Sequence, residues 1–393
     1  MRALRTLSPW VLCALLLAAC GGGDPTVPGS GSPSGAPTTK GSFTAVVSFG
    51  DSLSDLGTYT PATSTTRDGK PPYIGGKFTT NTDTATIWIQ NVATTLGVLV
   101  TPAEVGFDGV SVKCPAQANP ALANTCTGYG QGGSRVTNPD GINHDSGALT
   151  VPVVTQIQNH LTRFGSFKSS DLIIVFAGSN DVFAKFGAFT VAAAQIQADA
   201  KAGKLTADEA NRALFNAQAK AQAGMQTAAL QLADYVKTQI LAKGGKYVAV
   251  LELTDIGDTP FGNSLPASVK PVLTELSEIF NVWLRDGLTG QPVQLVDTYA
   301  LFKSIYANPA TYGIVNNTAP ACDAVKISAI TGGAVKDGSS LFCNATAGSP
   351  LNGLRTGASA TTWFFADAVH PTTGGHKIFS DAFTAQLKSF GWI

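Results

Sequence analysis

The stretch TAVVSFGDSLSD, residues 44–55, decides the fold, because an apolar run ends there in a glycine and a serine. Residues 44–49 are continuously apolar enough to predict a buried strand of a parallel sheet that is covered on both faces. Gly50 permits a tight turn after that strand. Ser52 then lies just past the strand's carboxyl end, where open α/β sheets bind their ligands. The stretch therefore predicts an α/β fold with a candidate nucleophile at the edge of the sheet.

Further strands and helices follow along the chain. Apolar runs predict strands at residues 172–177 (LIIVFA), 247–253 (YVAVLEL) and 293–296. Amphipathic spacing predicts helices at roughly residues 84–96, 153–164 and 373–390. The alternation of the two element types indicates a parallel sheet between helices, formed by one domain over residues 42–393.

Residues 190–243 have a different character, rich in Ala, Gln and Lys with apolar residues at helical spacing. We expect two helices that are separated near residues 203–206. Thr206 and Glu209 have the spacing of a capping box, which marks the start of the second helix. This helical insertion is either a lid over a site or a long crossover, and the crossover is the favoured interpretation.

The composition excludes some classes of protein. The chain has 393 residues, of which 44% are hydrophobic and 13% charged, as expected for a folded protein with a sizeable core. Lys+Arg and Asp+Glu are equal at 26 each, so no basic excess is present to bind nucleic acid.

The N-terminus predicts export. Arg2 and Arg5 precede a short apolar run that is less than the roughly 20 residues needed to span a membrane, so residues 1–19 read as a signal peptide. The run ends in Leu-Ala-Ala followed by Cys20, which resembles a bacterial lipoprotein processing site; an ordinary secretory peptide is the alternative. We expect Cys20 to carry lipid, residues 20–41 to be anchor and flexible Gly/Pro/Ser linker, and the protein to lie on a membrane of the bacterial envelope (outer membrane or periplasm) or to be secreted. No obligate protein partner is evident.

Four cysteines remain after Cys13 and Cys20 are set aside, and an exported chain favours disulfides between them. Three pairings are possible. Proximity in the sequence favours Cys114–Cys126 and Cys322–Cys343. Zinc binding is disfavoured, because the spacings are wide and no histidine lies close by.

A serine hydroxyl needs a base to become a nucleophile, and the chain has only 4 histidines. His144 lies in a polar loop, and His160 lies inside a predicted helix. His370 follows Asp367 by three residues, so that this carboxylate can accept a hydrogen bond from the Nδ1–H of the imidazole. A surface helix cap would also suit this pair.

Donors for an oxyanion are also present. Asn180, in the sequence GSND at residues 178–181, follows directly on a predicted strand, although the same residues would suit a turn. The stretch GYGQGG at residues 128–133 offers backbone N–H groups. It matches the dinucleotide fingerprint, but no strand precedes it and no helix follows, so nicotinamide and flavin binding are excluded. The chain contains no Walker P-loop, HExxH or GxSxG motif.

Together these motifs resemble the blocks of the GDSL, or SGNH, family of esterases and lipases, from residue 42 to the C-terminus. The matching segments are FGDSLSD at 49–55, GYGQGGS at 128–134, GSND at 178–181 and DAVHPT at 367–372, and residues 75–81 with Trp88 resemble a segment common in the family. The resemblance implies that Ser52 is the nucleophile, with Asp367 and His370 as partners. It also implies an oxyanion hole from the Ser52 N–H, the Asn180 amide and a second-block glycine, best aligned with Gly133 and with Gly132 as the alternative.

The resemblance implies a three-layer α/β/α sandwich, flavodoxin-like, around a mostly parallel five-stranded sheet. The implied activity is hydrolysis of a carboxylic ester, on a small molecule or a lipid, through an acyl-enzyme on Ser52 and without metal or cofactor. A phospholipase, a lipid acyltransferase or a polysaccharide deacetylase are alternatives within ester chemistry. A surface lipoprotein that binds ligands without catalysis is the alternative from another class.

Overall fold

The centre of the fold is a parallel sheet with strand order β1-β4-β5-β6. The computed structural model describes residues 28–63 and 75–393. The strands are β1 (Ala45–Gly50), β4 (Asp171–Phe176), β5 (Tyr247–Leu251) and β6 (Gln294–Val296). Nearly all their residues are buried, as the continuous apolar runs predict. The predicted α/β fold with helices on both faces of a parallel sheet is confirmed.

The expectation of five strands is wrong for the described residues, in which this sheet has four. The place beside β1 is taken by an irregular stretch that pairs with it through a single bridge, Ser48 to Gly128. The Ser48 N–H donates to the Thr127 carbonyl (2.9 Å) and the Tyr129 N–H donates to the Ser48 carbonyl (2.8 Å). The chain then turns, with the Ser134 N–H donating to the Gln131 carbonyl, so the pairing ends before a strand can form.

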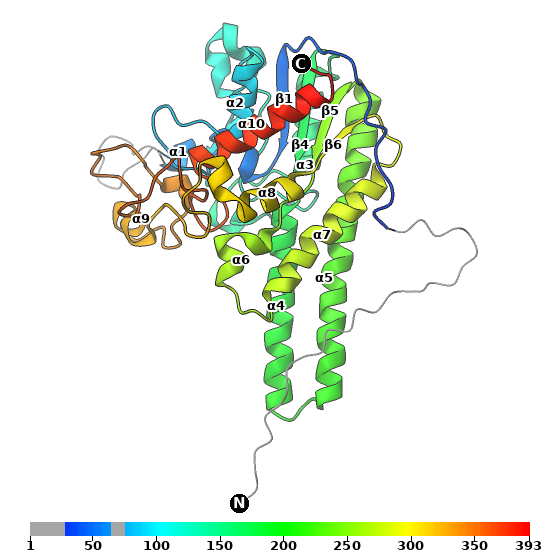
Figure 1. The fold of residues 1–393 in the computed structure, drawn as a ribbon, viewed down its shortest axis with the longest axis vertical. Coiled ribbons are helices and arrows are strands. Elements are labelled where there is room, and N and C mark those ends of the chain that lie inside the picture. The colour runs from blue at the N-terminus through cyan, green and yellow to red at the C-terminus, as the bar shows by residue number, and fades with distance from the viewer. Residues whose placement is uncertain (1–27, 64–74) are drawn as a thin grey trace, which may run out of the picture.

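Helices cover both faces of the sheet (Figure 1). On one face lie α2 (Trp88–Thr95), α8 (Thr298–Ala307) and α10 (Thr373–Ser389). Phe176 of β4 meets this layer, with its ring centroid 6.2 Å from Trp88 and 5.8 Å from Phe379. On the other face, Phe49 of β1 lies against His160 of α3 (Val153–Phe164). Next to α3 lies α5 (Ala207–Tyr235), which packs in turn on α7 (Lys270–Gly287).

The segment between β4 and β5 forms a long helical hairpin. Its helices are α4 (Ser179–Lys201) and α5, and Figure 1 shows their connected ends reaching well away from the sheet. The predicted break and capping box are confirmed: the Thr206 N–H donates to Glu209 Oε2 (2.8 Å), and the Glu209 N–H donates to Thr206 Oγ1 (3.3 Å). The hairpin therefore forms the crossover between two neighbouring parallel strands.

The remaining elements are short and lie around one end of the sheet. They are α1 (Thr60–Thr63), β2 (Glu104–Phe107), β3 (Val110–Lys113), α6 (Pro260–Ser264) and α9 (Ala324–Ile330). Strands β2 and β3 pair antiparallel as a separate hairpin. No helix in the described part of the chain is long and apolar enough to cross a membrane.

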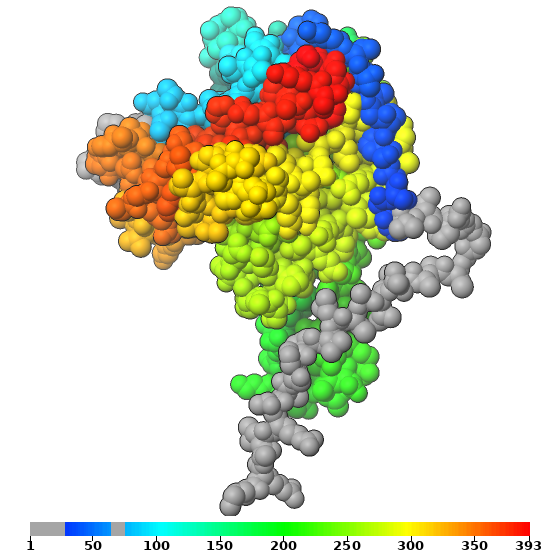
Figure 2. Space-filling model, in the orientation of Figure 1, coloured from blue at the N-terminus to red at the C-terminus, as the bar shows by residue number. Residues whose placement is uncertain are grey.

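Residues 28–41, expected to belong to a flexible linker, instead lie along the outside of the body (Figure 2). The indole N–H of Trp392 donates to the Pro37 carbonyl (2.7 Å), and the Gly41 N–H donates to the Trp392 carbonyl (2.8 Å). The Tyr247 hydroxyl donates to the Lys40 carbonyl (3.0 Å). These bonds hold the segment in place despite its composition. The predicted signal peptide and Cys20 lie outside the described residues.

Both predicted disulfides are confirmed. Cys114–Cys126 has a Cα–Cα distance of 5.3 Å and Cys322–Cys343 one of 6.0 Å. The first joins the end of β3 to the glycine-rich stretch that pairs with β1. The second lies in the long segment between α8 and α10. All four thiols are thus used in covalent bonds rather than as metal ligands.

Candidate active site

Ser52, His370 and Asp367 form a continuous chain of hydrogen bonds at the carboxyl end of β1. Ser52 begins a short 3-10 turn directly after the strand, and the other two lie in the loop that leads into α10. His370 Nε2 lies 2.8 Å from Ser52 Oγ. His370 Nδ1 lies 2.9 Å and 2.8 Å from the two oxygens of Asp367. This is the geometry in which an imidazole can take the serine proton while the carboxylate orients the ring.

The turn that presents Ser52 is fixed by its neighbours. Gly50 is required there, because a Cβ atom at this position would lie 2.1 Å from the Phe176 carbonyl oxygen. The side chain of Gln156, from α3, accepts from the Gly50 N–H (2.9 Å) and donates to the Gly50 carbonyl (2.8 Å). The Trp88 indole N–H donates to the Leu53 carbonyl (2.9 Å). Both helix layers therefore help to hold the turn that carries Ser52.

The Asp367 carboxylate is buried and fully hydrogen-bonded. Oδ1 accepts from the N–H groups of Val369 (2.9 Å) and His370 (2.8 Å), and Oδ2 accepts from the Ser340 N–H (2.8 Å). Burial by itself raises the pKa of Asp367, but the neighbouring His370 charge and these hydrogen bonds together hold the pKa well below its usual range. Asp367 therefore stays ionised and favours the tautomer with a proton on Nδ1, which leaves Nε2 as the acceptor facing Ser52.

The two candidate glycines differ in what their N–H groups do. The Gly132 N–H donates to Asp55 Oδ2 at 2.8 Å. The N–H groups of Gly133 and Ser52 have no acceptor among residues 28–63 and 75–393. Gly133 has a φ of +82°, and a Cβ there would lie 2.2 Å from the Ile142 carbonyl oxygen, so glycine is needed for this conformation. The structure thus favours Gly133 as the available donor.

Asn180 lies in the first turn of α4, at the carboxyl end of β4. One hydrogen of its amide is used, since Nδ2 donates to the Ser134 carbonyl at 2.9 Å. The adjacent Asp181 accepts from Arg135 Nε (3.0 Å) and from the Val136 N–H (2.9 Å). These bonds tie the start of α4 to the end of the glycine-rich stretch. They orient the Asn180 amide and leave its second hydrogen for a ligand.

These groups open onto one large cavity of ≈ 1760 Å³. Its lining includes Ser52, Gly132, Gly133, Asn180, Asp367 and His370. Much of the wall is apolar, with side chains that include Tyr59, Phe78, Phe107, Phe183, Phe261 and Leu351. The Phe78 ring lies 4.8 Å from the imidazole of His370, measured between centroids. None of the described lining residues comes from residues 190–243, which agrees with a crossover rather than a lid.

The other candidates from the sequence lie elsewhere. His144 is exposed in its loop, with Nδ1 3.1 Å from Thr150 Oγ1. His160 is buried in α3, and its ring is stacked on Phe167 at 4.4 Å. Within the described residues, no group of three or more His, Cys, Asp or Glu side chains is placed to hold a metal ion.

Sequence reasoning missed three residues that position the site: Asp55, Gln156 and Ser340. Asp55 belongs to the first motif, but its contact with the second appears only when the two are brought together. Gln156 is itself buried on the face of α3 that also carries Ile157 and His160, and nothing in the sequence marks it as a contact of Gly50. Ser340 contributes its peptide N–H, for which no sequence signal exists.

Comparison with known proteins accords with this geometry. Among the curated proteins compared with the chain, none matches it. A family model described as GDSL-like Lipase/Acylhydrolase matches residues 46–383, from β1 into α10. The match includes every residue of the site described above and most of the chain. The chain therefore belongs to the GDSL-like lipase/acylhydrolase family.

Proposed function

We propose that this protein hydrolyses carboxylic esters through an acyl-enzyme on Ser52. The family supports ester hydrolysis in general. The observation that carries the finer proposal is the 2.8 Å contact between Ser52 Oγ and His370 Nε2, continued from Nδ1 to the buried Asp367. A nucleophile, a base and a group that orients the base are the three parts that this chemistry needs.

The reaction has two matching steps. His370 Nε2 takes the Ser52 proton as Oγ attacks the carbonyl carbon. His370 then gives that proton to the departing alkoxide, and the acyl group remains bound to Ser52 as an ester. Water then attacks this ester while His370 takes its proton, and Ser52 leaves with the proton returned to Oγ. Asp367 stays ionised throughout and stabilises the positive charge of the imidazolium.

The negative oxygen of each tetrahedral intermediate needs donors that are already in place. The N–H groups of Ser52 and Gly133 and the second amide hydrogen of Asn180 are the available ones. Because they are held by the surrounding backbone before substrate arrives, little reorganisation is required in the transition state.

The volume and apolar wall of the cavity favour substrates with a substantial acyl chain over acetyl esters alone. The same features suit a phospholipase or a lipid acyltransferase, which is the second candidate function. We also propose that Cys20 carries lipid and places the enzyme at an envelope membrane. Cys20→Ser should then move the protein from the membrane fraction to the soluble fraction, and an unchanged distribution would argue against a lipid anchor.

A panel of p-nitrophenyl esters from acetate to palmitate, with phospholipids added, tests the proposal on the wild type and on Ser52→Ala. Ser54→Ala is the matched control, because Ser54 lies in the same turn and its buried hydroxyl has no partner among the described residues. We expect Ser52→Ala to retain only residual hydrolysis and Ser54→Ala to remain active. Hydrolysis by Ser52→Ala at the wild-type rate would refute the proposal.

A further inference from the structure

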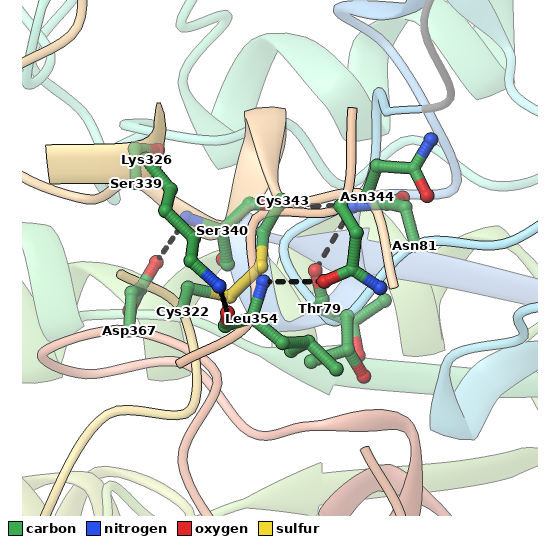
Figure 3. The surroundings of a disulfide bond; sticks show 12 residues. Thr79, Asn81, Cys322, Lys326, Ser339, Ser340, Cys343, Asn344, Leu354 and Asp367 are labelled. Carbon is green, nitrogen blue, oxygen red and sulfur yellow. Dashed lines mark hydrogen bonds between the residues drawn. A yellow bond between two sulfur atoms is a disulfide. The ribbon is translucent and has the colours of Figure 1, made fainter. Parts of the chain in front are cut away.

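The Asp367 carboxylate belongs to a ring of covalent and hydrogen bonds that includes the Cys322–Cys343 disulfide; Figure 3 shows this disulfide and the bond between Ser340 and Asp367. The Ser340 N–H donates to Asp367 Oδ2, and three residues later Cys343 is bonded to Cys322. The Cys322 N–H donates to the carbonyl of Ala366 (2.8 Å), the residue that precedes Asp367. The disulfide therefore joins the segment that carries Ser340 to Cys322, whose N–H is hydrogen-bonded to the residue before Asp367.

The ring is well packed and is supported from outside. Cys322, Cys343 and Ala366 form a small buried apolar cluster with Ile327, separate from the main core. On the other side, Asn81 Nδ2 donates to the Ser340 carbonyl (2.9 Å), and the Asn81 N–H donates to the Cys343 carbonyl (2.8 Å). Asn81 thus fastens residues 340–343 to the segment that also carries Phe78, whose ring contacts His370.

Oδ2 of Asp367 depends on this ring more than Oδ1 does. Oδ1 accepts from the N–H groups of the two residues two and three positions further along the same loop, so its partners move with it. Both oxygens lie within hydrogen-bond distance of His370 Nδ1 (2.9 Å for Oδ1 and 2.8 Å for Oδ2), but the backbone donor of Oδ2, Ser340, comes from a segment 27 residues away in the sequence. Only a tertiary connection can keep that donor in place.

We propose that Ser340 is a positioning residue for the reaction, acting through its peptide N–H, and that the Cys322–Cys343 disulfide holds this N–H on Asp367. The inference rests on the proposed function, in which Asp367 orients His370. Loss of the donor lets the carboxylate rotate or shift. A misplacement of about 1 Å in the groups that hold a reacting residue costs about 10²-fold in rate. The expected loss is therefore chiefly in kcat, and KM is measured alongside because Ser339, Leu341 and Phe342 beside Ser340 line the described cavity.

The local backbone allows a variant that removes little besides this N–H. Ser340 is the first residue of a 3-10 turn (Ser340–Phe342), a position that accepts proline because its fixed φ suits the start of a helix. The preceding Ser339 has φ −48° and ψ 127°, which is compatible with a following proline. Ser340→Pro thus replaces the donor by a ring carbon next to Oδ2. Ser340→Ala keeps the N–H and removes only the hydroxyl, which helps to lower the pKa of the neighbouring Asp367, so this variant separates the effect of the hydroxyl from that of the N–H.

The second disulfide is a matched control. Cys114 and Cys126 are 12 positions apart, against 21 for the pair near Asp367, and both pairs are buried. The sulfur atoms of the control pair contact Thr101, the Ala123 carbonyl and Arg163, none of which belongs to the site. Removal of either disulfide should lower stability by a similar amount. Only one should lower kcat.

The test measures kcat and KM on a p-nitrophenyl ester, per active site titrated with a fluorophosphonate, for purified folded variants. Ser340→Pro and the Cys322→Ala/Cys343→Ala double variant should lose about 10²-fold in kcat. Ser340→Ala should lose far less than Ser340→Pro, and Cys114→Ala/Cys126→Ala should lower Tm with kcat close to wild type. If Cys322→Ala/Cys343→Ala does not fold, the comparison of Ser340→Pro with Ser340→Ala alone tests the positioning role of the Ser340 N–H.

A Ser340→Pro protein with wild-type kcat would overturn the inference, as would equal losses in Ser340→Pro and Ser340→Ala. Ser52→Ala, run alongside, separates this from a failure of the proposed function. If Ser52→Ala is inactive while Ser340→Pro is fully active, the result supports Ser52 as the nucleophile and contradicts only the positioning role of Ser340.

Discussion

The carboxylate of Asp55 accepts a hydrogen bond from the N–H of Gly132 at 2.8 Å, and so joins the turn that carries Ser52 to the glycine-rich stretch. The same buried carboxylate accepts from the N–H groups of Gly57 (2.9 Å) and Thr58 (2.7 Å). Because Gly132 is engaged in this way, its neighbour Gly133 is the glycine with an N–H left for an oxyanion. Asp55 thus sets the relative position of two parts of the proposed oxyanion hole.

Asp55→Ala should lower both stability and kcat. The change leaves three buried N–H groups without their acceptor, at a cost of about 1–3 kcal/mol for each one that finds no other partner. Urea unfolding followed by ester hydrolysis measures the two effects. Asp83→Ala, at an exposed turn and outside the residues with a positive φ, is the control. If Asp55→Ala unfolded at the wild-type urea concentration, the carboxylate would not hold these segments together.

Asn180→Ala should lower kcat by about 10²–10³-fold, equivalent to roughly 2.7–4 kcal/mol of transition-state stabilisation, with little change in KM. The amide acts on an oxygen that becomes charged only in the transition state. Circular dichroism should show an intact fold, because Asp181 still ties α4 to residues 135 and 136. A kcat within about twofold of wild type would remove Asn180 from the oxyanion hole.

His160→Phe should flatten the loss of stability in acid. Burial lowers the pKa of His160 to about 4, against about 6.5 in the unfolded chain. Between these values the unfolded chain binds more protons, so the stability contributed at neutral pH is lost as the pH falls from about 6.5 toward 4. Phenylalanine keeps the ring stack on Phe167 and cannot be protonated.

The measured quantity is the difference in free energy of unfolding between wild type and His160→Phe at pH 7 and pH 5. It should shift in favour of the variant by about 1.4 kcal/mol per pH unit at most. Burial raises the pKa of both Asp51 and Asp55 to about 6, with the opposite sign of effect, but these groups are present in both proteins and cancel. A pH-independent difference would mean that His160 is not buried in its neutral form.

The sequence was most informative where side chains act close to strand ends. The strand before Ser52 and the helix after His370 are marked by continuous apolar runs and amphipathic spacing, and Asp367 lies three residues from His370. Local patterns of this kind depend on neighbouring residues in the sequence and not on tertiary contacts, so these elements and their order were predictable. The pairing of cysteines was predictable for a similar reason, because each disulfide joins neighbours in the sequence.

Long-range contacts outside the family motifs were not predictable. The contact between Ser340 and Asp367 uses a peptide N–H, which every residue but proline has. Residues 28–41 have the composition of a linker, yet backbone bonds to Trp392 fix them in place. The prediction of a fifth strand was wrong because the glycines at 128–133 turn the chain into the site after a single bridge to Ser48. In each case tertiary contacts, rather than local preference, determine the outcome.

The most direct test of the account is mass spectrometry of the protein after reaction with a fluorophosphonate. The account predicts one adduct per molecule, on the peptide that contains Ser52, with no adduct in Ser52→Ala and much slower labelling in His370→Ala. Stoichiometric labelling of a different residue, or an unmodified Ser52 in protein that is hydrolysing ester, would contradict it.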